Sequence, residues 1–134
     1  MRFFVVGIVA LALIATACNT EPRNAAYGEW ELVSLVVDGV EVPAIDEFRP
    51  YLRLDADVSG GGGCNQIRGQ YNVTDVSFVL SGMSMTERAC AEPERMEQEE
   101  RYFTALSAAR SYEREDDELR LYDRDGNLLL RFEK

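Results

Sequence analysis

The sequence predicts a mainly β, α+β fold: a small antiparallel β-barrel-like sheet of lipocalin-type topology with one helix packed against it. Three observations lead to this fold class. After residue 26, most of the chain consists of short segments in which apolar and polar residues alternate, as they do in half-buried strands. Turn signals such as Asp38-Gly39 separate these segments. One stretch, residues 93–110, changes to helical periodicity, so the helix is expected to cover an end or a gap of the barrel.

Residues 1–17 are predicted to be an export signal. Arg2 precedes an apolar run, and Ala15-Thr16-Ala17 has the A-x-A form of a cleavage site. The run is shorter than the roughly 20 apolar residues that a transmembrane helix needs. A core helix is the alternative, but nothing polar interrupts the run to give such a helix an outer face.

Cleavage after Ala17 would leave Cys18 as the first residue, and there the segment resembles a bacterial lipoprotein signal. The resemblance implies that Cys18 carries acyl chains that attach the protein to a membrane. Asn19 then implies the outer membrane, facing the periplasm, if the host has two membranes. The alternative is plain secretion with Cys18 as a free thiol. Residues 18–26 would form a polar tether, and residues 27–134 the folded domain.

The first part of this domain is predicted to be strands. Trp30 and Leu32 face one side of the opening segment, while Glu29 and Glu31 face the other. The Asp38-Gly39 hairpin signal and a connection bracketed by prolines separate this segment from the next ones. The strands expected here are residues 27–37, 40–42 and 51–57, with residues 43–50 irregular.

A run of four glycines, residues 60–63, is expected to let the chain turn sharply or pass close to a neighbour. Strands are predicted on its far side at residues 66–73 and 76–86. In the first of these, Ile67, Tyr71 and Val73 share a face, and Gly69 at the remaining position of that face suggests a bulge or a barrel corner.

The helix is predicted to begin at Pro93, a residue that suits a first helical turn. Met96, Phe103 and Leu106 follow helical spacing, and the charged residues between them are expected to face solvent. Alternation returns at residue 111. The chain is expected to end in a hairpin of residues 119–122 and 128–132, joined by a turn at residues 123–127.

Cys64 and Cys90 are predicted to form a disulfide. Of three cysteines in an exported chain, one would carry lipid, and the other two would meet in an oxidising compartment. Closing this loop would stabilise the fold by roughly 3.5 kcal/mol on the chain-entropy estimate. A redox-active pair is the alternative, but it would need an exposed thiol of low pKa near positive charge, and the chain has no Cys-x-x-Cys.

The formal net charge is −10, and loss of Arg2 with the signal would make it one unit more negative. Such a surface repels nucleic acid and anionic lipid headgroups, so no nucleic acid partner is expected. It suits solubility, and it also suits a basic partner.

No catalytic constellation is expected, and neither a cofactor nor a metal site. The chain has no histidine, the commonest general base and zinc ligand. The glycine run lacks the Lys-[Ser/Thr] of a phosphate loop. Asp123-x-Asp125-Gly126 lacks the later ligands of a calcium loop, so a hairpin turn is preferred. An acidic cluster is expected to be a solvated connection after the helix, and an aromatic set to fill the barrel rather than line a pocket. The cluster is Glu113, Glu115, Asp116, Asp117 and Glu118, and the aromatic set is Trp30, Tyr71, Phe78 and Phe103.

Several motifs, taken in order, resemble the META domain family, which includes the HslJ-like heat-shock lipoproteins. The motifs are Trp30 with Leu32, the Gly-Gly-Cys-Asn that ends at Asn65, Gly69-x-Tyr71, Thr86-x-x-Ala89-Cys90, Met96-Glu97 with Phe103 and Leu106, and Leu119-x-Leu121-x-Asp123-x-x-Gly126. The resemblance covers nearly the whole chain after the signal. It implies a β-barrel-like domain of the cell envelope with a role in stress tolerance or motility, and it brings no catalytic residue.

The sequence therefore favours a non-catalytic, lipid-anchored envelope domain that supports envelope integrity under stress and acts by binding. The alternative is a carrier or pilot-type lipoprotein whose barrel takes an acyl chain or a partner's peptide. A filled core would argue against that carrier. An enzyme is not expected.

Overall fold

The computed structural model describes residues 26–134, so the predicted signal, Cys18 and the tether up to residue 25 lie outside the described residues. Within residues 26–134 the chain forms nine β-strands, one α-helix and one short 3-10 helix, η1 (Asp46–Phe48). The helix is α1 (Pro93–Ala108). The strands are β1 (Gly28–Val37), β2 (Val40–Pro43), β3 (Tyr51–Leu54), β4 (Val58–Gly61), β5 (Gln66–Val73), β6 (Phe78–Met85), β7 (Ser111–Glu115), β8 (Glu118–Tyr122) and β9 (Leu128–Glu133).

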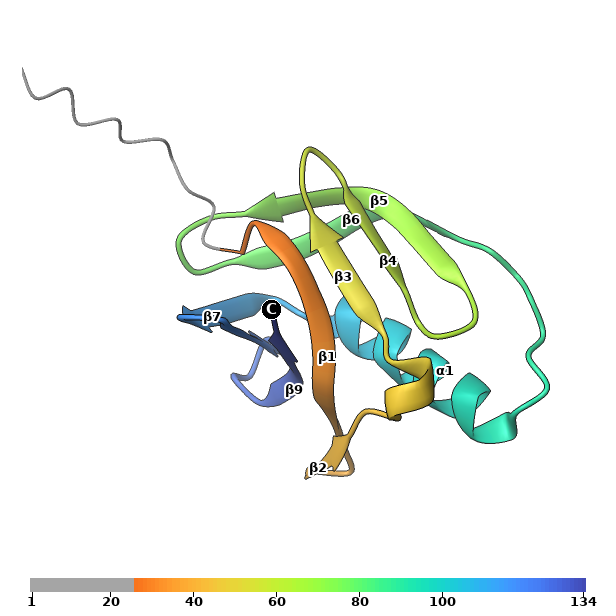
Figure 1. Cartoon of the computed structure of the whole chain (residues 1–134). Helices are drawn as coiled ribbons and strands as arrows, with labels where there is room; N and C mark the ends of the chain where they lie inside the picture. The colour runs from red at the N-terminus through yellow and green to blue at the C-terminus, as the bar shows by residue number, and fades with distance from the viewer. Residues whose placement is uncertain (1–25) are drawn as a thin grey trace, which may run out of the picture.

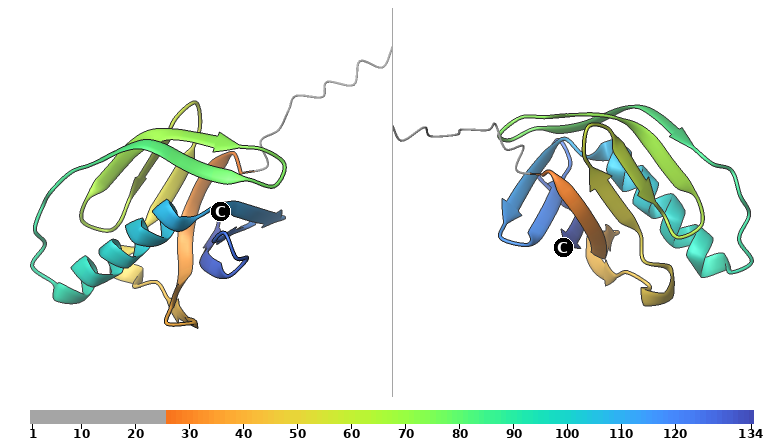
Figure 2. Two further views of the ribbon diagram at one scale, coloured as in Figure 1. Left: turned by 180° about the vertical axis from the view of Figure 1, so that it is seen from behind. Right: turned by 45° about the horizontal axis from the view of Figure 1, so that its top comes forward.

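The strands form one antiparallel sheet in the order β6-β5-β4-β3-β1-β9-β8-β7, and β2 pairs only with β1. The sheet curls into an open half-barrel (Figures 1 and 2). Neighbours in this order are also consecutive in the chain, except that β3 pairs with β1 past the intervening β2 and β9 returns to pair with β1. This up-and-down order confirms the predicted barrel-like fold of mainly antiparallel strands with one helix.

The half-barrel is open between its end strands, β6 and β7. Within the described chain, a single bridge joins them, between Ser77 and Ser111, and beside it the N–H of Phe78 donates to the carbonyl of Arg110 at 3.0 Å. Helix α1 connects these two strands in sequence and lies across the mouth of the sheet (Figure 2). The helix thus covers a gap, as the sequence predicts.

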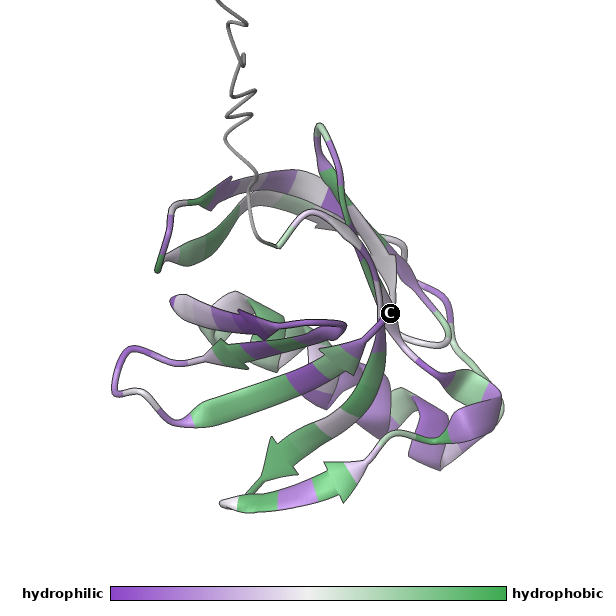
Figure 3. Cartoon of the chain, turned by 60° about the vertical axis from the view of Figure 1, so that its left-hand side comes forward, coloured by the Kyte–Doolittle hydropathy of each residue, from purple (hydrophilic) through white to green (hydrophobic). Residues whose placement is uncertain are grey.

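The side chains that alternate along the strands fill the space between the sheet and α1. Trp30, Leu32, Phe78, Tyr102 and Phe132 are all fully buried there. Hydrophobic and hydrophilic residues alternate along several strands (Figure 3), and in β1 the apolar Trp30 and Leu32 are buried while Glu29 and Glu31 are exposed. The expectation that the aromatic residues fill the barrel is met by Trp30 and Phe78, while Tyr71 and Phe103 are partly buried against the core.

Several elements agree closely with the sequence. The two-residue turn at Asp38 and Gly39 has both φ angles positive, at 51° and 78°, and joins β1 to β2, as expected of a tight hairpin. The pairing of β5 with β6 shifts register between Arg68 and Gln70. A bulge is therefore present at Gly69, as predicted, with the extra residue on β6, where Gly82 and Met83 lie opposite Gly69. Pro93 occupies the start of α1.

The glycine run corrects the sequence analysis. The strand expected over residues 51–57 ends at Leu54 and the chain turns at residues 55–57, before it turns again at Gly62 and Gly63. Gly60 and Gly61 belong to strand β4, which pairs with β3 and β5. A Cβ on Gly60 would lie 2.6 Å from the carbonyl oxygen of Tyr51. Gly60 and Gly61 therefore serve the close approach of neighbouring strands, while Gly63, with a φ of +106°, serves the turn, so both roles expected of the run are present.

The acidic cluster of residues 113–118 lies in the hairpin of β7 and β8, whose turn is Asp116-Asp117. Glu113, Glu115, Asp116 and Asp117 are exposed, so the cluster is solvated as expected, but it consists of paired strands rather than a connection. Arg120 forms ion pairs with Glu113, Glu115 and Glu118. The following turn is the hairpin turn that the sequence predicts: the carboxylate of Asp123 accepts the N–H groups of Asp125 and Asn127, both at 2.9 Å.

Candidate functional site

The disulfide predicted from the cysteine count is present in the structure. Cys64 and Cys90 are bonded, with their Cα atoms 6.2 Å apart. Cys64 lies in the loop of residues 62–65 that follows β4, and Cys90 lies in the segment between β6 and α1. The bond therefore ties the end of the glycine run to the segment that leads into the helix. The third predicted site residue, Cys18, lies outside the described residues.

A buried carboxylate lies directly beneath this bond. Glu99 of α1 is 4% exposed. Its Oε2 accepts the backbone N–H of Cys64 at 2.9 Å and that of Asn65 at 2.5 Å, and its Oε1 accepts the Asn65 side-chain amide at 2.6 Å. Charged residues of this helix were expected to face solvent, and Glu99 corrects that expectation. Its burial is possible because three N–H donors replace the water that the carboxylate loses.

The glycine run makes this arrangement possible. A Cβ on Gly62 would lie 2.5 Å from Cγ of Glu99 and 2.8 Å from Cζ of Phe103. Only glycine lets the loop lie directly on the helix. Gly63 has a φ of +106° and turns the chain there, and its carbonyl accepts Nε of Arg95 at 2.6 Å. Arg95 and Glu99, one turn apart on α1, thus hold the loop from the same helix face.

Asn65 extends the arrangement to the segment after β6. Its Oδ1 accepts the N–H of Arg88 at 2.7 Å, and its Nδ2 donates to the carbonyl of Arg88 at 3.1 Å. Oδ1 also accepts the hydroxyl of Thr86 at 3.0 Å. The side chain therefore binds the backbone of Arg88 as a neighbouring strand would. Residues 86–88 continue the line of β6 although they are not part of the strand.

A groove of about 860 Å³ lies between this segment and α1. One wall consists of residues 85–89, and the other of α1 from Pro93 to Thr104. Its apolar side chains are Met85, Ala89, Met96 and Phe103, of which Met85 is 52% exposed. Methionine side chains adapt to irregular apolar surfaces and are common where a surface binds varied partners. The disulfide, Asn65 and Glu99 brace the wall opposite the helix.

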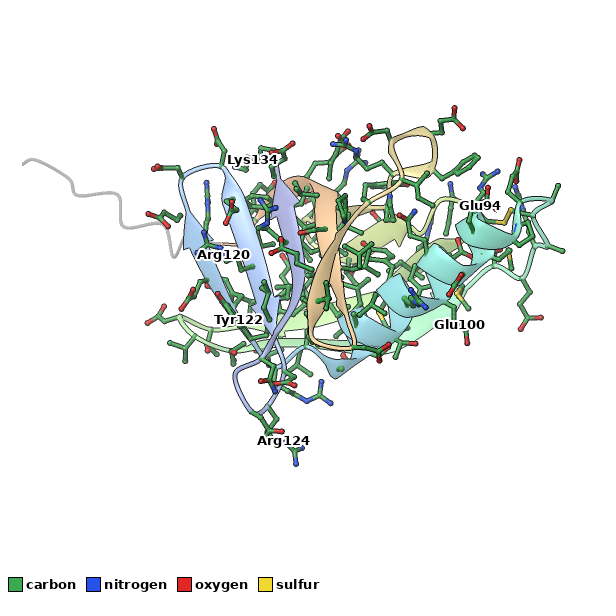
Figure 4. The ribbon with its side chains drawn as sticks, turned by 90° about the horizontal axis from the view of Figure 1, so that it is seen from below. Glu94, Glu100, Arg120, Tyr122, Arg124 and Lys134 are labelled. Carbon is green, nitrogen blue, oxygen red and sulfur yellow. A yellow bond between two sulfur atoms is a disulfide. The ribbon has the colours of Figure 1, made fainter. Side chains whose placement is uncertain are left out.

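The rim of the groove is acidic. Glu87, Glu97 and Glu100 lie along it, and Glu97 pairs with Arg101 at 2.5 Å. Within the described residues, no ion pair involves Glu87 or Glu100. Glu100 projects from α1 away from the body of the domain, as does Glu94 nearer the start of the helix (Figure 4). The chain as a whole has a formal net charge of −10. This acidic rim therefore attracts cations and repels anions.

The chemistry of the groove depends on the side chains and backbone groups that line it. The two cysteines within residues 26–134, Cys64 and Cys90, are bonded to each other. In the part of the chain that the structure describes, no group of three or more Cys, Asp or Glu side chains is placed to hold a metal ion. The α-helix found there also lacks the length and apolar character needed to cross a membrane. The chemistry that the groove provides is apolar contact, negative charge and backbone hydrogen bonding.

Sequence reasoning missed both Glu99 and the groove. A signal for Glu99 was present, because it lies three residues before Tyr102 and seven before Leu106 on α1, and positions at this spacing share one helix face. Because Glu99 is charged, it was expected to face solvent in spite of this position on the buried face. The groove carried no comparable signal, since residues 86–90 have neither strand nor helix periodicity.

Comparison with known proteins agrees with the architecture. A family model described as META domain matches residues 23–134. An NMR structure of a protein from Burkholderia xenovorans is similar with 22% identity and a TM-score of 0.66, covering 99% of this chain and 97% of that one. A crystal structure of a DUF4847 family protein from Bacteroides vulgatus has 15% identity and a TM-score of 0.50, covering 81% of this chain and 93% of that one. These structures show the fold alone. No curated protein matches the chain.

Proposed function

The chain belongs to the META domain family, and on that basis we propose that it is a non-catalytic, lipid-anchored domain of the bacterial cell envelope that acts by binding. The observation that carries this function is the groove between residues 85–89 and α1. Its walls are held by a disulfide and by the buried contacts of Glu99 and Asn65. A surface that is already ordered before binding loses less conformational entropy when a partner arrives.

Anchoring is supported by the start of the chain. Arg2, the apolar run and Ala15-Thr16-Ala17 form an export signal, and Cys18 would be the first residue after cleavage. Acyl chains on Cys18 would hold the domain at the membrane, facing the periplasm if the host has two membranes. A disulfide between the other two cysteines fits an oxidising compartment. A role in envelope integrity under stress follows from the family resemblance. Secretion without lipid is the alternative.

The carrier alternative is supported only in part. The inside of the half-barrel is filled by large side chains, among them Trp30, Phe78 and Phe132, which are fully buried. This packing argues against an acyl chain in the barrel, because interiors of this density hold few voids. The groove on the outside remains suited to a partner's peptide. Binding at the surface is therefore favoured over transport inside the sheet.

Metabolic labelling with a clickable fatty acid tests the anchor. The wild-type protein should incorporate the label and sediment with membranes, whereas Cys18→Ser should lose the label and become soluble. Cys64→Ser/Cys90→Ser is the matched control, which should keep the label. A soluble, unlabelled wild-type protein would contradict anchoring.

Photocrosslinking in intact cells tests binding at the groove. A photoreactive amino acid at Met85, inside the groove, should give a discrete crosslinked product. The same residue at Val40, which is 63% exposed on β2 far from the groove, should not. Equal products at both positions, or none at Met85, would contradict binding there.

A further inference from the structure

The segment that forms one wall of the groove presents an unused strand edge. The N–H of Thr86 donates to the carbonyl of Gln66 on β5 at 3.0 Å, and Asn65 binds both backbone groups of Arg88. Backbone groups of successive residues in an extended chain point to opposite edges. The N–H and C=O groups of Met85 and Glu87 therefore point away from β5, toward the groove. Within the described residues, no hydrogen bond outside the β5–β6 pairing engages the backbone of Met85 or Glu87.

Further along β6 the same edge is also open. Phe78 directs its N–H to the carbonyl of Arg110, so Leu80, two residues on, points its N–H to the same side. The bulge adds one residue to β6 between Ser81 and Ser84 and reverses the alternation, so beyond it Met85 points to this side. Past the bridge between Ser77 and Ser111, β6 and β7 separate, and no pairing of β6 with β7 or α1 follows within residues 78–85. An exposed edge of this kind is a template for another strand.

Resting on the proposed binding role, we infer that the groove takes an extended peptide segment of a partner protein, rich in apolar residues and lysine or arginine, which adds to the edge at Met85 and Glu87 as an antiparallel strand. Three features point to this occupant. The open edge supplies main-chain hydrogen bonds, Met85, Met96 and Phe103 supply apolar contacts, and the acidic rim supplies attraction for cationic side chains. The antiparallel direction follows the pairing of every strand in this sheet.

The same features argue against the other occupants. An acyl chain would cover the N–H and C=O groups of the edge without satisfying them, which is unfavourable. Its carboxylate or phosphate end would also meet Glu87 and Glu100. A second copy of this chain, edge to edge, would bring two rims of the same sign together in a molecule whose charge is already −10.

A synthetic peptide, acetyl-Lys-Val-Lys-Leu-Lys-Val-Lys-amide with a fluorophore, serves as the probe. Residues directly opposite each other in an antiparallel pair place their side chains on one face. Met85 faces the inside of the sheet, since it lies opposite the buried Ile67. The valines and leucine of the bound peptide would therefore face the groove and direct their own N–H groups to the edge. N-methylation of these three residues removes those donors, while N-methylation of the lysines removes only outward ones.

Binding is measured by fluorescence anisotropy on the exported protein in nanodiscs of zwitterionic lipid. The peptide methylated on valine and leucine should bind at least about tenfold more weakly, as expected for the loss of two or three hydrogen bonds. The lysine-methylated peptide should bind nearly as well as the parent. Met85→Lys should weaken binding by about tenfold as well, and the matched change Val40→Lys should not.

Other results would overturn the inference. Equal binding of the two methylated peptides would show attraction by charge alone, and a loss restricted to the lysine-methylated peptide would contradict antiparallel pairing. Binding of a fluorescent fatty acid that Met85→Lys abolishes, without peptide binding, would assign the groove to an acyl chain. A dimer that dissociates on Met85→Lys would assign it to a second copy. Each of these results leaves the lipid-labelling test of the anchor unaffected, so failure of the peptide and failure of the proposed function are distinguishable.

Discussion

The carboxylate of Glu99 on α1 accepts hydrogen bonds from both the backbone N–H and the side-chain amide of Asn65, at 2.5 and 2.6 Å. This contact joins the helix to the loop after β4. Asn65 in turn binds the backbone of Arg88. Glu99 and Asn65 therefore connect the helix to the opposite wall of the groove through hydrogen bonds. The groove is therefore a property of the packed domain and not of either wall alone.

Glu99→Gln should lower the free energy of unfolding by about 2–3 kcal/mol, because an amide nitrogen would replace an acceptor that faces N–H donors. Urea unfolding of the variant and the wild type measures this. Glu100→Gln changes the neighbouring exposed residue and should stay within about 0.5 kcal/mol of the wild type. An equal loss of unfolding free energy in both variants would contradict a stabilising role for the buried hydrogen bonds of Glu99.

Gly62→Ala should also be destabilising, by about 1–3 kcal/mol, because the new Cβ would overlap Glu99 and Phe103. A double-mutant cycle with Glu99→Ala separates the two clashes. The cost of the alanine at position 62 should be smaller when Glu99 is truncated, and it should not vanish, since Phe103 remains. Strictly additive costs would contradict the direct contact between Gly62 and Glu99.

The disulfide should resist alkylation and stabilise the fold. Without reductant, iodoacetamide should label neither Cys64 nor Cys90. Cys64→Ser/Cys90→Ser should lower the free energy of unfolding by about 3 kcal/mol, and dithiothreitol should destabilise the wild type but not this variant. Labelling of both cysteines in the unreduced protein would refute the bond.

Alkaline pH should unfold the protein partly through Tyr102. Burial raises the pKa of Tyr102 well above its ordinary value of 10.0, and its hydroxyl donates to the carbonyl of Tyr51 at 3.0 Å. In the unfolded chain the phenol ionises near its ordinary pKa. Its contribution is thus fully present below about pH 10 and is lost as the pH rises toward the folded-state pKa. Tyr102→Phe should make the decline of stability above pH 10 shallower, which unfolding curves at several pH values measure. An unchanged decline would contradict this.

Acidic pH should lower the stability of the fold partly through Glu41. Hydrogen bonds from Ser34 and then Arg131 lower the pKa of Glu41 below its ordinary value of 4.5. The contribution of this carboxylate is therefore present above about pH 4.5 and is lost as the pH falls through the lower, folded-state pKa. Glu41→Gln should flatten the acid limb of the stability profile, and Ser34→Ala should flatten it in part. A profile that neither variant changes would show that this network has no role in acid unfolding.

The sequence predicted those parts of the fold in which side chains carry the pattern. Trp30 and Leu32 alternate with Glu29 and Glu31, and β1 follows that alternation. Strand β4 was missed, because Gly60 and Gly61 have no side chains and thus no alternation to detect. This strand forms because its backbone pairs with β3 and β5. Such pairing leaves no pattern in the residues of the strand itself.

The candidate site was predictable to a smaller extent. The pairing of Cys64 with Cys90 followed from the cysteine count and the expected compartment. The burial of Glu99 did not, because a carboxylate becomes acceptable inside a protein only when specific donors meet it. Those donors are the N–H groups of Cys64 and Asn65, more than thirty residues away in the chain. The open edge at Met85 and Glu87 likewise appears only once Asn65 is seen to hold Arg88.

The most direct test of the binding groove is residue-resolved amide exchange by NMR, with and without the lysine-valine-leucine peptide. In the free protein, the amides of Thr86 and Arg88 should exchange slowly, because both are hydrogen-bonded, while those of Met85 and Glu87 should exchange quickly. At saturating peptide, Met85 and Glu87 should become slow as well. Exchange at Met85 and Glu87 that the peptide leaves unchanged would contradict strand addition at this edge.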